Sequence, residues 1–177
     1  TVSTLLLFFI LSIGIIKAEK YALLVGVGDY PESKGWPDLA SVNDIVHLKE
    51  VLKIHNFAQQ NMTIMINAEA TKDNIIKAFD RLTSKVKLGD IVMIHFSGHG
   101  QQIRDFNKDE ADGYDEAFVP YDSPKYYKED EYEGGKLLID DEINKLTYRI
   151  RKKLGATGQL ILTMDSCHSG SGNRALG

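Results

Sequence analysis

Cys167 is the only cysteine of the chain, and it follows an apolar run, within the segment TMDSCHSGSG at residues 163–172. A thiol attacks other molecules as its thiolate, and an ordinary cysteine, with a pKa of about 8.5, is mostly protonated at neutral pH. A histidine within hydrogen-bonding reach can remove that proton and later protonate a leaving amine. The chemistry of this sequence therefore depends on which histidine reaches Cys167.

Three of the five histidines compete for this role. His168 is adjacent in sequence, but an extended backbone would turn its side chain away from Cys167. His95 lies inside the apolar run at residues 90–98, where a hydrogen-bonded core histidine is expected. His99 stands at the end of the same run between two glycines, which leave the backbone room to turn. We therefore select His99 as the partner.

Polar groups beside these two residues suggest how a substrate would bind. Alternation along an extended chain places Asp165 on the face of Cys167, and Ser97 on the face of His99. A carboxylate there favours a cation, such as the Arg or Lys side chain that precedes a scissile bond, although it could also only orient a neighbouring helix or loop. The backbone N–H groups of Cys167 and Gly100 are candidates for an oxyanion hole, which stabilises charge on an attacked carbonyl oxygen.

Strands must bring these groups together. Nearly continuous apolar runs predict buried strands at residues 21–27, 62–67, 90–98 and 159–166. Helices with apolar stripes are predicted between them, the second behind a Thr71 cap and the third ending at Gly155. The three stripes are Ile45, Leu48, Val51 and Leu52; Ile75, Phe79, Leu82 and Val86; and Ile143, Leu146, Ile150 and Leu154.

This order of elements predicts an α/β fold with a mostly parallel sheet, helices on both faces and right-handed crossovers. Ligands of such sheets bind outside the carboxyl ends of the strands. If the runs at 90–98 and 159–166 are neighbouring strands, His99 and Cys167 converge at one edge of the sheet.

Composition limits the partners. A net charge of −4 argues against a nucleic-acid ligand. Residues 105–142 carry 14 of the 25 acidic residues against four lysines, and this stretch is either a solvated loop or a site for an ion or a cationic substrate.

The N-terminus is interpreted as a signal peptide at residues 1–18. Its apolar run at residues 5–16 is too short for a membrane span, which needs about 20 residues, and Ala18 is the small residue expected before a cleavage site. The sequence thus predicts a secreted or periplasmic protein with no stable membrane span. A redox role for Cys167 would need a second, resolving cysteine, which this sequence lacks.

Several phrases together resemble the caspase-like cysteine peptidases (peptidase C14, clan CD), and among these the bacterial metacaspase-like group. The resemblance covers residues 21–177 and rests on YALLVGVGDYP (21–31), ND (43–44), HFSGHGQQ (95–102), DEADGYDEAFVPYD (109–122), LLIDDEI (137–143) and DSCHSG (165–170). It implies a caspase-haemoglobinase-like three-layer sandwich, with a p20-type catalytic domain at residues 20–177.

On matching positions, the resemblance implies a catalytic dyad of His99 and Cys167 that needs no cofactor. Asp165, Ser97 and Asp44 would form the pocket for a basic P1 side chain of a protein or peptide substrate. Asp44 has an alternative interpretation, a capping box with the serine that starts the first helix.

Metacaspases that bind calcium also suggest an ion site. Asp115, Asp140 and Asp141 stand where similar aspartates occur, but the further aspartate expected shortly after the cysteine is absent. Helix capping explains Asp140 and Asp141 equally well. Calcium is therefore an alternative to the interpretation that no cofactor is required.

The sequence thus predicts a cysteine endopeptidase that cleaves after Arg or Lys. The alternative is a catalytically silent caspase-like domain that acts in assembly or partner binding. Relatives of this kind continue beyond the position of Gly177, so we expect a truncated chain whose missing p10-like portion packs on the sheet edge, and a fragment that is inactive by itself.

Overall fold

The computed structural model describes residues 18–105, 108, 110–111 and 113–166. Its centre is a four-stranded parallel sheet in the order β2-β1-β3-β7, the fold class that the sequence predicts. The four strands are β1 (Lys20–Gly26), β2 (Met62–Ile66), β3 (Ile91–Ser97) and β7 (Gln159–Asp165).

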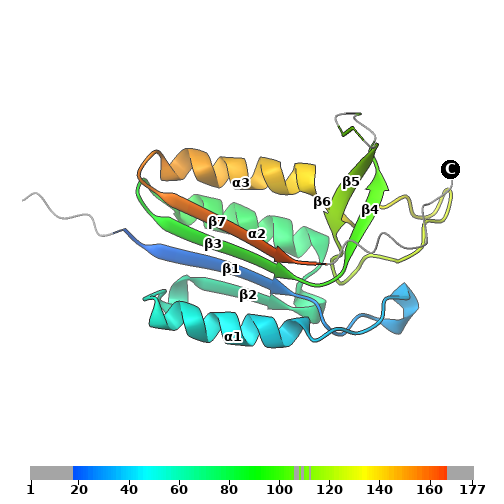
Figure 1. Ribbon diagram of the computed structural model, residues 1–177, viewed down its shortest axis with the longest axis horizontal. Helices are drawn as coiled ribbons and strands as arrows, with labels where there is room; N and C mark the ends of the chain where they lie inside the picture. The colour runs from blue at the N-terminus through cyan, green and yellow to red at the C-terminus, as the bar shows by residue number, and fades with distance from the viewer. Residues whose placement is uncertain (1–17, 106–107, 109, 112, 167–177) are drawn as a thin grey trace, which may run out of the picture.

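Helices cover both faces of this sheet (Figure 1). Helix α1 (Ser41–Ile54) lies on one face, and α2 (Lys72–Lys85) and α3 (Asp140–Leu154) lie on the other. Three short 3-10 helices, η1 (Glu32–Lys34), η2 (Gln59–Asn61) and η3 (Asn67–Glu69), lie in the connections. The predicted three layers are confirmed.

Successive side chains of the central strands point to opposite faces of the sheet, so they contribute to two hydrophobic cores. Leu23, Ile94 and Phe96 are completely buried on the α2/α3 face, where Phe96 stacks on Phe79 with ring centroids 6.3 Å apart. Leu24 and its neighbours form a smaller core against α1 on the opposite face. Because β1 and β3 are buried on both faces, their sequences read as continuous apolar runs.

The predicted helical stripes of α2 and α3 are confirmed, since all their members are buried. Thr71 caps α2 by accepting a hydrogen bond from the backbone N–H of Asn74 at 3.3 Å. Gly155 follows α3 with φ +64°, a conformation that favours glycine. The stripe predicted for α1 is wrong at Val51, which is 46% exposed. At about 100° per residue, Val51 lies about 120° around the helix from the buried Ile45.

A second sheet was not predicted. Strands β4 (Gly100–Arg104), β5 (Tyr114–Phe118) and β6 (Leu138–Ile139) form an antiparallel sheet between the predicted strand at 90–98 and the predicted third helix. This sheet stands beyond the carboxyl ends of the parallel strands (Figure 1).

Strand β7 differs from the prediction that all four parallel strands are buried on both faces. It is an edge strand among the described residues, and Ile161, Leu162 and Met164 are 43%, 41% and 39% exposed. The reason is that the described helices cover the faces of β1 and β3 more completely than those of β7.

Over the described part of the chain, no helix combines the length and the apolar character needed to cross a membrane. The predicted signal peptide falls almost wholly on residues 1–17, which lie outside the described residues. The predicted domain boundaries stay predictions.

Candidate active site

The neighbouring strands β3 and β7 end together at one edge of the sheet. Ser97 and Asp165 are register partners at their last positions, and the backbone N–H of Gly98 donates to the carbonyl of Asp165 at 3.1 Å. His99 comes two residues after the end of β3. The strand pairing on which the sequence argument depended is present, whereas Cys167 itself lies outside the described residues.

The imidazole of His99 is held by the loop between β1 and α1. Its Nε2 is 2.8 Å from the backbone carbonyl oxygen of Pro37. A carbonyl oxygen only accepts hydrogen bonds, so Nε2 carries a proton, and in the neutral ring Nδ1 carries the lone pair. Nδ1 is therefore the nitrogen of His99 that can accept a proton.

Two aromatic rings from the same loop contact this imidazole. Trp36 stacks on it with ring centroids 4.9 Å apart and planes inclined by 28°. The ring of Tyr30 lies 5.2 Å away at 46°, and its hydroxyl accepts the backbone N–H of His99 at 3.2 Å. The ring is thus bounded by aromatic surface as well as hydrogen-bonded.

Tyr30 is itself fixed, because its hydroxyl donates to the carbonyl of Val119 at 2.9 Å. Burial raises the pKa of Tyr30 far above its ordinary value of 10.0, and the hydrogen bond from His99 opposes this only in part. The hydroxyl therefore stays protonated. Sequence reasoning missed Tyr30, Trp36 and Pro37. The available signal was a pair of large aromatic residues in an otherwise polar loop that leaves the carboxyl end of a strand.

The backbone N–H of Gly100, a predicted oxyanion-hole donor, points out of the β4–β5 ladder. Val119 donates its N–H to the carbonyl of His99, and Asp105 donates to Gly113, so the odd-numbered positions of β4 make the ladder bonds. Gly100 stands opposite Phe118 in a non-hydrogen-bonded pair. Its N–H is therefore directed away from β5.

The three residues predicted for a basic-side-chain pocket meet at the same edge. Ser97 is buried and donates its hydroxyl to Asp44 Oδ2 at 2.9 Å. Asp165 is exposed and stands beside Ser97 in register. The capping-box interpretation of Asp44 is wrong, because α1 has Ala40 as its N-cap and no side-chain cap hydrogen bond. Helix α1 instead places the Asp44 carboxylate beside Ser97, the last residue of β3.

His95 stands two residues before Ser97 on the same face of β3. Its Nδ1 is 2.8 Å from Thr163 Oγ1 on β7, so the predicted hydrogen-bonded histidine is confirmed, although it is half-buried rather than a core residue. Burial lowers the pKa of His95 from its ordinary value of 6.5, and the negative charges of Asp165 and Asp44 oppose that shift. The negative charges that act on His95 are therefore the two carboxylates of the predicted pocket.

The aspartates considered for calcium lie around β5 and α3. Within the described residues, no three or more His, Cys, Asp or Glu side chains are grouped so as to hold a metal ion. Asp115 is buried on β5, whereas Asp140 and Asp141 occupy the first turn of α3. Asp140 accepts the backbone N–H of Asp141 at 2.9 Å, and burial and the nearby negative charge of Glu116 raise its pKa. The N-cap of α3 is Ile139 and makes no side-chain cap hydrogen bond, so the capping interpretation of Asp140 and Asp141 is wrong, although both lie in the first turn. Calcium binding stays a prediction.

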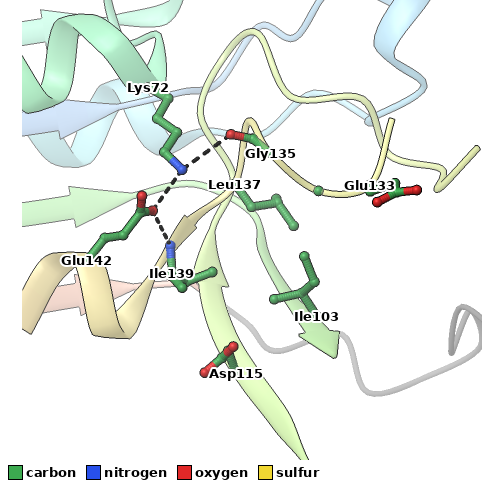
Figure 2. Close-up of a pocket in the computed structure, with 9 residues that line it drawn as sticks. Lys72, Ile103, Asp115, Glu133, Gly135, Leu137, Ile139 and Glu142 are labelled. Carbon is green, nitrogen blue, oxygen red and sulfur yellow. Dashed lines mark hydrogen bonds and ion pairs between the residues drawn. The ribbon is translucent and has the colours of Figure 1, made fainter. Parts of the chain in front are cut away.

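A separate cavity of about 190 Å³ lies beside the small sheet, lined by Ile103 of β4, Asp115 of β5, Lys72 of α2 and residues of the segment 133–142 (Figure 2). At its wall Lys72 Nζ is 2.8 Å from the carboxylate of Glu142 and donates to the carbonyl of Gly135 at 3.3 Å. The same carboxylate accepts the backbone N–H of Ile139 at 3.4 Å. These contacts join the start of α2 to the start of α3, so this network has a structural explanation.

Comparisons with known proteins show which family the chain belongs to. The chain matches the family model described as "Metacaspase, peptidase C14 domain" over residues 20–173. It is 35% identical over 163 residues to Metacaspase-1 of Plasmodium falciparum, covering 86% of this chain and 24% of that protein. It is 31% identical over 161 residues to Metacaspase-1 of Schizosaccharomyces pombe (87% and 35%) and 32% over 156 residues to Metacaspase III c of Phaeodactylum tricornutum (85% and 42%).

Among solved structures, the crystal structure of protein GSU0716 from Geobacter sulfurreducens matches with a TM-score of 0.65 and 28% identity, over 86% of this chain and 52% of that one. The sheet between helical layers is thus a caspase-haemoglobinase-like sandwich, as predicted. The chain spans less than half the length of the three curated relatives. From its match over nearly all of its length and from its strand order, the chain belongs to the metacaspase family of C14 peptidases.

Proposed function

We propose that the protein is a cysteine endopeptidase that uses His99 and Cys167 and cleaves after Arg or Lys. The observation that carries this proposal is the state of His99. Its Nε2 proton is engaged by Pro37 at 2.8 Å, which leaves Nδ1 as the base, at the edge where β7 leads toward Cys167. The family supplies the same reaction class.

The reaction would proceed through an acyl-enzyme. Nδ1 of His99 takes the thiol proton, and the sulfur of Cys167 adds to the scissile carbonyl carbon. The N–H groups of Gly100 and Cys167 stabilise the negative oxygen. His99 returns its proton to the leaving amine as the C–N bond breaks, which leaves a thioester. Water then loses a proton to His99 and displaces the sulfur, giving the free acid and the thiol.

Selectivity for a basic P1 residue follows from charge. Asp165 is exposed beside Ser97, and Asp44 accepts the hydrogen bond of the Ser97 hydroxyl. Two carboxylates around one hydroxyl favour a guanidinium or ammonium group over a substrate carboxylate, which they would repel. The same arrangement disfavours cleavage after Asp.

The experiment uses the full-length protein and a matched pair of peptide amides that differ only in Arg or Asp at P1. We expect wild type to cleave the Arg peptide, Cys167→Ala to abolish cleavage, and His99→Ala to lower kcat by about 10²–10⁴. Release of the peptide products is measured by mass spectrometry. Undiminished cleavage by Cys167→Ala would remove the nucleophile assignment.

The preference for Arg at P1 is tested separately, with a variant of Asp165. Asp165→Asn keeps the size of the side chain and removes its charge, so kcat/KM for the Arg peptide should fall while the rate of reaction of the thiol with a small alkylating reagent stays unchanged. A variant that still prefers the Arg peptide to the same degree as wild type would exclude Asp165 from the pocket.

The exposed apolar side chains of β7 support a second candidate, a partner-binding domain that does not cleave. The same assay separates the two, because a silent domain would leave both peptides intact in the full-length protein. Calcium dependence, a signal peptide and a secreted or periplasmic location stay predictions.

A further inference from the structure

We propose that Trp36 is a positioning residue for His99: it holds the plane of the imidazole and stabilises the cation that forms when the imidazole accepts the proton of Cys167. The inference rests on the proposed function of His99 as the base. It concerns a residue outside the sequence motifs that identify the family here, in the loop between β1 and α1.

One hydrogen bond does not fix an imidazole. The Nε2 contact with Pro37 sets where the ring points, but it leaves the ring free to tilt about the Nε2–oxygen direction. Stacking with Trp36 at 4.9 Å and 28° removes that freedom from one side, and Tyr30 at 5.2 Å limits it from another. Both separations lie within the range of favourable aromatic pairs. Together these contacts fix the direction of Nδ1.

Trp36 is well suited to this role because it is itself immobilised. It is 7% exposed, and its indole Nε1–H donates to the carbonyl of Ser123 at 3.0 Å. The ammonium of Lys125 lies 5.5 Å from the centroid of the indole ring, and the backbone N–H of Lys125 donates to the carbonyl of Lys34 at 2.9 Å. The loop between β1 and α1 and the segment around residues 123–125 therefore form one packed unit beneath the imidazole.

When His99 takes the thiol proton it becomes a cation that faces the indole and phenol rings, and aromatic faces attract cations. Trp36 should therefore stabilise the imidazolium that accompanies the thiolate. Loss of the indole would make proton transfer from Cys167 less favourable.

The test measures alkylation of Cys167 by iodoacetamide against pH in the full-length protein, with the modified peptide followed by mass spectrometry. In Trp36→Leu we expect the pH midpoint of alkylation to rise by about half a pH unit or more and kcat to fall more than tenfold with KM little changed. Phe57→Leu is the control, because Phe57 is also a buried aromatic with a lysine ammonium near its ring, 5.6 Å away, but lies beside Lys20 at the start of β1.

Suppose that His99→Ala changes the pH midpoint of alkylation but Trp36→Leu has the same midpoint as wild type. That result would overturn the inference about Trp36 and leave the proposed dyad standing. If His99→Ala leaves the alkylation profile unchanged, the proposed dyad fails instead. Should Trp36→Leu not fold, as judged by thermal unfolding, Trp36→Phe takes its place. Its smaller ring should move the midpoint in the same direction by less, and an unchanged midpoint would likewise overturn the proposal.

Discussion

At the scale of single residues, His95 and His99 have identical side chains but different hydrogen-bond partners, because one lies inside a strand and the other lies just after its end. Both belong to the segment HFSGH, yet His95 bonds a strand neighbour whereas His99 bonds a loop carbonyl. The sequence predicted this division, because a strand interior and a strand end differ in the partners they offer. It could not predict Trp36 or Pro37, since the path of the loop after β1 depends on packing against residues about 90 positions away.

The lowered pKa of His95 makes a prediction about stability. Its pKa in the folded protein lies below the ordinary value of 6.5, so the unfolded chain binds this proton first as the pH falls. The free energy of unfolding should therefore fall below about pH 6.5 through His95. His95→Gln should lose less stability than wild type between pH 7.5 and 5.5, as measured by urea unfolding at both values.

The matched control is His47→Gln on the exposed surface of α1, which keeps His95 and should therefore keep the acid loss that His95 causes. Comparison of variants at each pH cancels the acid effects that the three proteins share. Identical acid losses in wild type and His95→Gln would show that burial of His95 has no consequence for folding.

At the scale of elements, the long periodic helices were predictable and the small sheet was not. Helices α2 and α3 repeat apolar residues at helical spacing, and this pattern is local. Strand β4 reads GQQIR and β6 has only two residues, so neither carries a strand pattern of its own. Their pairing depends on β5, which shares a ladder with each, and such long-range contacts leave no local signal.

The start of α2 carries a prediction at this scale. Thr71 accepts the N–H of Asn74, and Asp122 from the acidic stretch accepts the N–H of Lys72 at 3.0 Å. Because the second cap remains, Thr71→Ala should lower the free energy of unfolding by about 0.5–1 kcal/mol, near the lower end of N-cap losses. Thr71→Ser keeps the acceptor and should stay close to wild type. Urea unfolding compares the three, and an equal loss in both variants would contradict the cap.

At the scale of the whole molecule, stability is concentrated in the inner strands. The α/β class, the helical layers and the neighbourhood of β3 and β7 were predictable, because alternating strands and helices allow few arrangements. The exposure of β7 was not, since QLILTMD has the composition of a buried strand. Whether β7 is buried depends on the helices and strands that pack against it, and its own sequence does not contain that information.

Substitution of two register partners on the same face of the sheet tests whether the inner strands contribute more to stability than β7. Ile94 on β3 is fully buried and Leu162 beside it on β7 is 41% exposed. Ile94→Ala should lower the free energy of unfolding of this chain by about 2–5 kcal/mol, and Leu162→Ala by less than about 1 kcal/mol. Chemical denaturation measures both. Comparable losses would mean that β7 is covered in solution.

The contacts around His99 join distant parts of the polypeptide. Pro37 and Tyr30 reach it across 62 and 69 positions, and the bonds that fix Trp36 and Tyr30 span 87 and 89. During synthesis, the imidazole therefore acquires its fixed orientation only after the segment beyond residue 119 has emerged and docked. A nascent or partly unfolded chain would carry the histidine and lack its orientation, so in the proposed peptidase the base would be positioned only once the fold is complete.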